Sequence, residues 1–347
     1  MNYKEDNFKM KRYGNLYEKI YNIDNLVLAH ENARKGKTHY TDVIMVDENP
    51  DLYLREIQKI LVDKTYRTSS YKTFIKHDGK KDREIFVLPY YPDRIIQWAI
   101  VQVLESIWMN TFIANTFSSL KGRGIHQGLV KLQKDLLNRN ETKYCLKFDI
   151  KKFYPSVDHV ILKSIIRKKI KDLDVLELLD EIIDSTSGVP IGNYLSQYFG
   201  NLYLSGFDHW NKEQNHMKYY YRYCDDVVIL HSDKHVLHEL VRKIKEYLAE
   251  NLFLSLKGNW QVFPTFIRGI DFLGYRCFGD YTLLRKNIVK EMAPKLKRMM
   301  KYEKITKRDR NIISSYYGWM SWCDSYRLER KYIIPLLAKE VITEEEC

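Results

Sequence analysis

The chain has 347 residues, 45% hydrophobic and 29% charged, and a formal net charge of +12. This is ample for a sizeable core with several subdomains, and the basic excess fits either a polyanion partner or a merely basic protein. Five cysteines without a CxxC pair argue against a disulfide framework or zinc site. The sequence contains no run of about 20 apolar residues, so no membrane span is predicted. The polar, basic first twenty residues do not resemble a signal peptide.

The first third of the chain predicts helices followed by a hairpin. Apolar residues recur at helical spacing in 22–34 and 50–62, on either side of a polar break at 35–39. Residues 71–88 alternate as strands do around a turn at 77–80. A strongly amphipathic helix is expected over 94–108, with Asp93 as its N-cap.

The middle of the chain alternates turns, strands and helices. The basic turn 121–126 contains two glycines that permit close approach to a phosphate, although an ordinary loop before the expected helix 127–137 explains it equally well. An apolar strand over 144–148 ends at Asp149, and helical sequence begins at Asp158 and continues over 160–183.

The remaining chain predicts a second hairpin and a basic helical end. Strands at 219–223 and 227–230 flank Asp225 and Asp226, and a helix with a charged, solvated face follows over 234–250. Strand-like segments are expected at 260–263 and 270–277. From residue 284 the chain is basic and helical, and it includes an aromatic helix over 314–326.

Three aspartates stand at strand ends: Asp149 and the adjacent pair Asp225-Asp226. Adjacent carboxylates repel each other, so a fold keeps them mainly where a cation neutralises them. One carboxylate plus a distant pair fits two-metal phosphoryl transfer, in which two Mg²⁺ about 3.5–4 Å apart activate a hydroxyl and hold a phosphate. The alternative for the pair alone is a plain Asp-Asp turn of a hairpin.

The order of these motifs resembles reverse transcriptases. FDIKKFYPSVDH (148–159) is similar to motif A and YCDD (223–226) to motif C, with GVPIGNYLSQYFGNLYL (188–204) in the place of motif B and FLGYR (272–276) in that of the primer grip. The resemblance covers about residues 80–330. It implies that Asp149, Asp225 and Asp226 are the catalytic, metal-binding carboxylates, with two Mg²⁺ for which Mn²⁺ substitutes.

The resemblance also implies a nucleotide pocket. Tyr154 falls where the family holds an aromatic residue that packs against the incoming sugar and excludes a 2′-hydroxyl, with Phe153 before it; both are otherwise core aromatics. Arg83 and Arg94 resemble the residues that grip the triphosphate, a task that suits the guanidinium fork. Lys257 resembles the lysine that protonates the leaving pyrophosphate.

The sequence of motif B indicates which subfamily of reverse transcriptases the chain resembles. Intron and retroviral enzymes carry Pro-Gln-Gly where this chain has Pro190-Ile191-Gly192, and Ile-Gly-x-x-x-Ser-Gln, ending at Gln197, resembles diversity-generating retroelement enzymes. These copy a template RNA with frequent errors at adenines. Replacing Gln by Ile removes a polar contact near the nascent pair, which weakens discrimination. The bland alternative is that Ile191 packs and Gln197 faces solvent.

Basic residues are expected to hold the template RNA and the primer or cDNA. They are Lys121 and Arg123 in the glycine-containing turn, and Arg285, Lys286 and Lys290 on the C-terminal helical segment. Binding through such residues falls steeply with salt. The alternative is a solvated basic face.

We therefore expect an α+β right-hand polymerase. Its parts are N-terminal helices and fingers (1–140), palm with motif A (141–159), fingers and palm helices with motif B (160–200), palm with motifs C to E (201–278), and a helical thumb (279–347). The expected function is RNA-directed DNA synthesis from dNTPs. The protein is expected to be bacterial or phage-encoded and cytoplasmic, with a small basic accessory protein and no membrane. The alternatives are a retron or phage-defence enzyme, and a non-catalytic RNA-binding scaffold.

Overall fold

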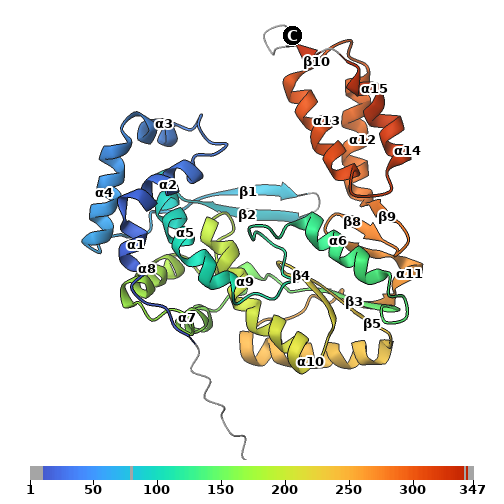
Figure 1. Cartoon of the computed structure of the whole chain (residues 1–347), viewed down its shortest axis with the longest axis horizontal. Coiled ribbons are helices and arrows are strands. Elements are labelled where there is room, and N and C mark those ends of the chain that lie inside the picture. Colours follow the sequence, from blue (N-terminus) through green and yellow to red (C-terminus); the bar gives the residue numbers. More distant parts are fainter. Residues whose placement is uncertain (1–10, 79–80, 340, 343–347) are drawn as a thin grey trace, which may run out of the picture. The chain divides into compact units, whose positions relative to one another are not determined.

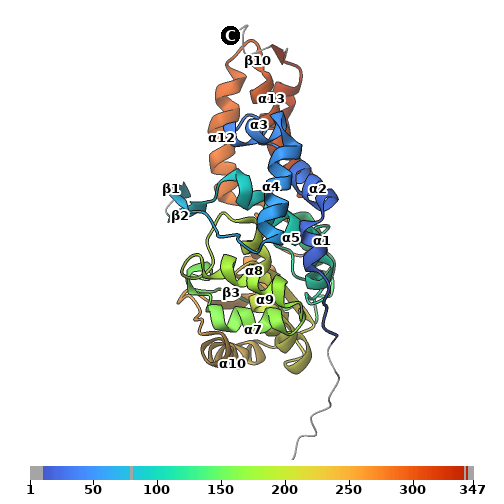
Figure 2. The same ribbon diagram turned by 90° about the vertical axis from the view of Figure 1, so that its left-hand side faces the viewer.

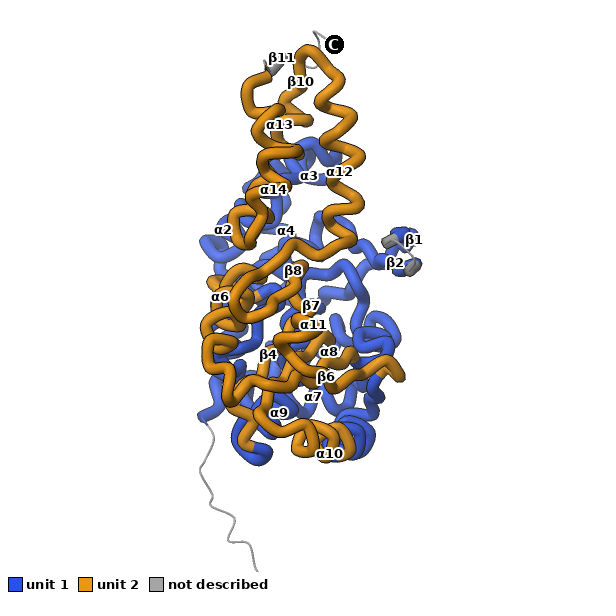
Figure 3. Tube along the Cα trace, turned by 90° about the vertical axis from the view of Figure 1, so that its right-hand side faces the viewer, with its two compact units in different colours: residues 1–119, 150–215, 243–256 blue, residues 120–149, 216–242, 257–347 orange. Residues whose placement is uncertain are grey.

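The structure is a computed structural model that describes residues 11–78, 81–339 and 341–342. Residues 1–10 of the polar, basic N-terminal stretch, two residues of the turn at 77–80 and Cys347 lie outside this part. The chain divides into two compact units (Figure 3). Unit 1 comprises Met1–Ser119, Ile150–Asn215 and Lys243–Leu256, and unit 2 comprises Leu120–Asp149, His216–Arg242 and Lys257–Cys347.

Unit 1 begins with four helices, α1 (Tyr17–Tyr21), α2 (Ile23–Ala33), α3 (Thr41–Glu48) and α4 (Pro50–Val62). The Asn22 side chain caps α2 by accepting from Asp24 N, and Pro50 starts α4, where its missing N–H costs nothing. Leu54, Ile57 and Leu61 form the buried stripe of α4. The helices expected over 22–34 and 50–62 are therefore confirmed.

A two-stranded antiparallel hairpin, β1 (Lys72–Asp78) and β2 (Lys81–Val87), follows as expected. It leads through one π-helical turn, η1 (Tyr90–Arg94), into α5 (Ile95–Met109). The prediction that Asp93 caps this helix is wrong. Asp93 is fully buried, and its carboxylate accepts from Tyr66 Oη at 2.7 Å and Ser69 N at 3.1 Å. The helical turn already begins at Tyr90, so Asp93 lies within it and not at the start of a helix.

Helices α7 (His159–Arg167), α8 (Leu173–Asp184) and α9 (Tyr194–His209) complete the middle of unit 1, and α7 packs against both others (Figure 2). Asp158 caps α7 by accepting from Ile161 N, and Asp172 caps α8 by accepting from Val175 N. The start of helical sequence at Asp158 is thus confirmed. A short 3₁₀ turn, η2 (Tyr154–Ser156), precedes α7, and η3 (Trp210–Gln214) continues α9 as a π-helical turn.

The core of unit 2 is a four-stranded antiparallel sheet in the order β4-β5-β3-β6. Its strands are β3 (Tyr144–Asp149), β4 (Tyr219–Tyr223), β5 (Asp226–His231) and β6 (Gln261–Pro264), and helix α6 (Ile125–Leu136) packs against β4. Strand β5 is buried on both faces from Val227 to Leu230, as its continuous β-branched and apolar run predicts. Helix α10 (Lys234–Leu252) follows β5.

A second, three-stranded sheet joins β7 (Ile270–Phe272), β8 (Tyr275–Cys277) and β9 (Thr282–Leu284), after the short helix α11 (Thr265–Arg268). The single strand-like segment expected over 270–277 is in fact a tight hairpin. Its two turn residues, Leu273 and Gly274, have φ of +54° and +88°, which is the geometry of a two-residue hairpin turn. Leucine is rare at positive φ, so the sequence carried only the glycine as a signal.

Unit 2 ends in a helical bundle of α12 (Lys286–Met300), α13 (Lys307–Met320), α14 (Tyr326–Leu328), η4 (Glu329–Ile333) and α15 (Ile334–Leu337) (Figure 1). The short strands β10 (Ile305–Thr306) and β11 (Val341–Ile342) pair in parallel at its end. The aromatic helix expected over 314–326 is wrong in its bounds, because α13 begins earlier at a capping box of Thr306 and Asp309 and stops at Met320. None of the described helices is long and apolar enough to cross a membrane.

Candidate active site

The turn between β4 and β5 brings the expected carboxylates together within unit 2. Asp226 is the first residue of β5 and pairs in register with Asp149, the last residue of β3. Asp225 lies in the two-residue turn with Cys224, whose φ is +56°. Antiparallel register therefore places three aspartates from two distant segments at one edge of one sheet.

A buried arginine supports this turn from within. Arg222 on β4 is fully buried, and its guanidinium donates to the carbonyl oxygen of Cys224 at 3.1 Å. A fully buried arginine is rare unless its charge is paired. The hydrogen bond from Arg222 to the turn therefore helps to fix the position of Asp225. Sequence reasoning missed Arg222, because an arginine within a strand gives no sign of the face to which it points.

Two lysines face the three carboxylates. Lys257 Nζ lies 3.6 Å from Asp149 Oδ1 and 3.6 Å from Asp225 Oδ2, so one ammonium bridges the two side chains. Lys147 Nζ lies 3.0 Å from Asp226 Oδ2. The backbone N–H of Lys257 also donates to the Asp149 carbonyl at 2.9 Å, which holds the lysine beside the end of β3. The site thus places two ammonium groups beside three carboxyl groups.

The pKa of the Asp226 carboxyl departs from its ordinary value. Burial raises its pKa to about 6, the Lys147 ammonium opposes that rise, and Asp149 and Asp225 add to it. Its Oδ1 atom is buried without a hydrogen-bond partner. Lys147 was not singled out from the sequence, but one signal was present. It precedes Asp149 by two residues on the same strand, and such residues share a face.

The donor chemistry of this site fits a divalent cation. In the described part of the chain no three Asp, Glu, His or Cys side chains are arranged around one metal position. Asp149 and Asp225 nevertheless share a cation already, the ammonium of Lys257, and Asp226 has an oxygen without a partner. Carboxylate oxygens are the ligands that Mg²⁺ prefers. Asp149 and Asp225 would hold the ion, with Asp226 beside them.

The residues expected in the nucleotide pocket lie in unit 1. Tyr154 donates from its hydroxyl to Gln197 Oε1 at 3.0 Å, and Ser119 Oγ donates to the same oxygen at 3.1 Å. Gln197 therefore bonds to Tyr154 and is only half-exposed. Phe153 is 3% exposed and packs against the Tyr154 ring. Gly200 on α9 makes room for both rings, because a Cβ there would lie 3.1 Å from Tyr154 Cε1 and 3.2 Å from Phe153 Cε1.

The remaining residues of the expected pocket are spread over unit 1. Arg83 is exposed on β2, where it pairs in register with Lys76. Arg94 is half-buried at the end of η1 and donates from Nε to the Ala33 carbonyl at 3.3 Å; burial lowers the pKa of its guanidinium. The carbonyl of Ile191 accepts from Phe86 N at 2.8 Å, so the motif B loop is tied to strand β2.

The basic residues expected to contact nucleic acid lie in unit 2. Lys121 is exposed and Arg123 half-exposed in a tight turn, where Arg123 N donates to the Leu120 carbonyl at 3.0 Å and Gly122 has a φ of +71°. Lys286 and Lys290 are exposed on α12. Arg285, which precedes that helix, forms an ion pair with Asp271. The three lysines are thus exposed, whereas Arg123 and Arg285 are half-exposed and Arg285 also has a structural contact.

Comparison with known families agrees with this arrangement. The sequence profile of the reverse transcriptase (RNA-dependent DNA polymerase) family matches residues 75–277, which include the three aspartates, Tyr154 and Gln197. The chain belongs to this family.

Curated relatives match only part of their own length. The chain is 27% identical over 209 residues to the group II intron-encoded protein LtrA of Lactococcus lactis, a match that covers 56% of this chain and 34% of that protein. It is 24% identical over 234 residues to protein YkfC of Escherichia coli, covering 54% of this chain and 61% of that one. The chain therefore spans about one to two thirds of these relatives.

Among solved structures, apo telomerase from Candida tropicalis is similar with a TM-score of 0.51 and 14% identity, over 72% of this chain and 52% of that one. At this identity the likeness concerns the fold alone. Together with the family match it confirms the α+β right-hand polymerase fold expected from the sequence.

Proposed function

We propose that this protein is an RNA-directed DNA polymerase that copies a template RNA into cDNA from dNTPs. The observation that carries the proposal is the group of Asp149, Asp225 and Asp226 at one sheet edge, where an ammonium already bridges two of them. A fold that gathers three carboxylates at one edge is suited to bind cations. Transfer of a nucleotidyl group needs such a site, because negative charge develops on the phosphate and on the leaving pyrophosphate.

When bound, two Mg²⁺ would activate the primer 3′-hydroxyl and neutralise the leaving group. The chain's own residues have separate tasks in this proposal. Asp149 and Asp225 would hold the cations, Arg222 keeps the turn in place through the Cys224 carbonyl, and Lys257, beside both carboxylates, would donate a proton to the leaving pyrophosphate. Tyr154 limits the space beside the sugar, and Arg83 and Arg94 bind the triphosphate.

The proposed division of labour along the chain follows the family pattern. Residues 1–140 and part of 160–200 would form the fingers, 141–159 and 201–278 the palm, and 279–347 the thumb. Exposed Lys286 and Lys290 on α12 and Lys121 in the glycine turn support the proposal that template and primer are held through phosphate contacts.

Primer extension on an RNA template with Mg²⁺ and dNTPs tests the proposal. Asp225→Asn should lower the rate at least about 10³-fold and leave RNA binding unchanged, because it removes charge but not shape. Asp233→Asn is the matched control, since Asp233 is an exposed capping residue of α10 and Asn also caps. Wild-type protein that binds RNA but never extends a primer, even with Mn²⁺, would favour the RNA-binding scaffold.

We further propose that the enzyme serves a diversity-generating retroelement, together with a structured template RNA and a small basic accessory protein. Ile191 supports this, because an apolar side chain there offers no hydrogen bond to the nascent base pair. Sequencing of the cDNA decides the point. Errors concentrated opposite template adenines support the proposal, whereas faithful copying favours a retron or phage-defence enzyme. The similarity to an intron-encoded protein makes an intron RNA a useful second template.

A further inference from the structure

A histidine at the start of α7 is held between two acceptors. His159 Nε2 lies 2.9 Å from the carbonyl oxygen of Gly188, and its Nδ1 lies 3.2 Å from Asp184 Oδ1. The side chain is 23% exposed. A carbonyl and a carboxylate both accept hydrogen bonds, so the ring makes both bonds together only by donating from both nitrogens.

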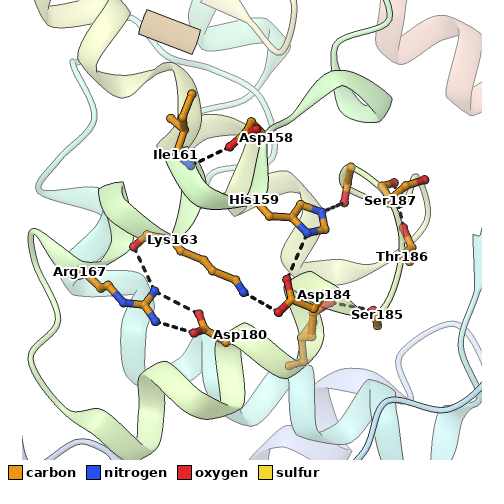
Figure 4. A network of polar contacts seen from close by, with 12 residues as sticks. Asp158, His159, Ile161, Lys163, Arg167, Asp180, Asp184, Ser185, Thr186 and Ser187 are labelled. Atoms are coloured by element: carbon orange, nitrogen blue, oxygen red, sulfur yellow. Dashed lines mark hydrogen bonds and ion pairs between the residues drawn. The ribbon is translucent and has the colours of Figure 1, made fainter. Parts of the chain in front are cut away.

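The ion pairs around His159 fix one side of this arrangement. Lys163 and Arg167 project from α7 toward α8, where Lys163 bonds to the second oxygen of Asp184 and Arg167 pairs with Asp180 (Figure 4). Partial burial would raise the pKa of Asp184, but its bonds to Lys163 and His159 keep that pKa below the ordinary value. These ion pairs therefore hold α7 and α8 together. The hydrogen bond from His159 Nε2 connects this helix pair to the carbonyl of Gly188.

Gly188 leads directly to the expected nucleotide pocket. Its φ is +65°, and a Cβ there would lie 2.6 Å from the Pro155 carbonyl oxygen and 2.8 Å from that of Tyr154, so the loop rests on this backbone. The next residue, Val189, donates from its N–H to the Tyr154 carbonyl at 2.9 Å. The carbonyl that His159 holds thus belongs to the turn that contacts the backbone of Tyr154.

We propose that His159 is a positioning residue for nucleotide selection, which fixes the motif B loop at Gly188 and through it the placement of Tyr154. The proposal rests on the proposed polymerase function for its consequence in catalysis. The effect of His159 on the motif B loop can be measured without catalysis. The bond to Gly188 carries the effect, and the bond to Asp184 orients the ring.

Two substitutions with amide side chains test the two hydrogen bonds of His159 separately. The Nε2 of glutamine occupies about the place of histidine Nε2, so His159→Gln keeps a donor for Gly188. The Nδ2 of asparagine corresponds to histidine Nδ1, so His159→Asn keeps a donor for Asp184 only. Lys163→Met is the matched control, because it weakens the same ion-pair network without touching the bond to Gly188.

The first measurement is hydrogen exchange at the Val189 amide of the free protein. His159→Asn should speed exchange about tenfold, while His159→Gln and Lys163→Met should stay near wild type. The second is steady-state extension, in which His159→Asn should raise the KM for dNTP about five- to tenfold with kcat nearly unchanged, and His159→Gln should restore it.

Three outcomes would overturn the inference: unchanged Val189 exchange in His159→Asn, equal impairment of both amide variants, or a Lys163→Met effect as large as that of His159→Asn. Equal impairment with lower thermal stability would make His159 a purely structural residue. An inactive wild-type protein would refute the polymerase proposal instead. In that case the exchange result alone decides whether His159 holds the loop.

Discussion

Lys147 and Asp226 form a diagonal ion pair across neighbouring strands, with Lys147 Nζ 3.0 Å from Asp226 Oδ2. Lys147 on β3 is opposite Val228 on β5, and Asp226 is opposite Asp149. The pair therefore lies on the same face as Asp149, and Lys147 compensates the carboxylate whose pKa is raised by burial. The Lys147 ammonium also donates to the Asp271 carbonyl, which ties the first sheet to β7.

We expect Lys147→Met to destabilise the protein by about 1–3 kcal/mol at pH 7, because it leaves a half-buried carboxylate without its counter-ion. In an Asp226→Asn background the same change should cost clearly less, with a coupling energy above about 0.5 kcal/mol. Urea unfolding of the four proteins in EDTA measures this cycle. Additive effects would mean that the ion pair contributes nothing to stability.

The raised pKa of Asp226, about 6 mainly through burial, predicts a pH dependence of stability. The folded protein holds this proton more tightly than the unfolded chain, whose aspartate titrates near 3.8. The stabilisation is fully present below the unfolded value and is lost as pH rises through about 6. Relative to wild type, Asp226→Asn should therefore gain about 2–3 kcal/mol between pH 4 and 7.5. A constant or shrinking difference in metal-free unfolding curves would contradict this.

Gly192 is expected to be irreplaceable for the fold of unit 1. Its φ is +129°, and a Cβ there would lie 2.2 Å from the Phe86 carbonyl oxygen, an atom of the strand to which the motif B loop is bonded. Gly192→Ala should cost more than about 3 kcal/mol, since backbone strain and a clash with backbone add.

Gly122 provides the matched control for this substitution. It also has a positive φ, +71°, but a Cβ there would meet nothing within 4 Å. Gly122→Ala should cost only about 1–2 kcal/mol of backbone strain. Thermal unfolding of both variants makes the comparison, and equal losses would show that the close approach at Gly192 is relieved by a small shift.

The order of motifs made the carboxylates predictable, because a run of apolar residues ending in Asp149 and a hairpin around Asp225-Asp226 are local signals. What the sequence could not supply was register. The Lys147–Asp226 pair exists only because β3 and β5 align Asp149 with Asp226, and a one-residue slip would turn Lys147 to the other face.

Predictions from local sequence were wrong or missing where a side chain bonds to residues far away in the chain. Asp93 has the sequence context of an N-cap, yet it is buried and its Oδ1 accepts hydrogen bonds from Tyr66 and Ser69, more than twenty residues earlier. His159 lies in the stretch that resembles motif A, but its proposed role was not predicted, because that role depends on Gly188 and Asp184. Such contacts cannot be read from residue type or spacing.

Lys257 is expected to compete with divalent cations for Asp149 and Asp225, because its ammonium lies 3.6 Å from both carboxylates. Lys257→Gln should lower thermal stability in EDTA and tighten Mn²⁺ binding about three- to tenfold, as measured by electron paramagnetic resonance. Lys151→Gln is the control, since Lys151 carries the same charge two residues beyond Asp149 but is exposed. If the two changes had equal effects, the loss of one positive charge would explain the result, and the position of Lys257 would not matter.

Tyr154 is expected to limit the sugar that the pocket accepts. Its ring lies against Gly200, where a Cβ would come within 3.1 Å, and its hydroxyl is bonded to Gln197, so the ring has little freedom to move aside. Tyr154→Ala should reduce the preference for dNTP over rNTP at least about tenfold, because steric exclusion is the only discrimination against an added hydroxyl that an apolar wall offers.

The conservative change separates the ring from its hydroxyl. Tyr154→Phe keeps the wall and loses only the bond to Gln197, so the sugar preference should remain within about threefold of wild type. Competition between dNTP and rNTP in single-nucleotide extension gives both ratios directly. If Tyr154→Phe relaxed the preference as much as Tyr154→Ala, the Tyr154–Gln197 bond would be the selective element, and the ring would serve only to carry the hydroxyl.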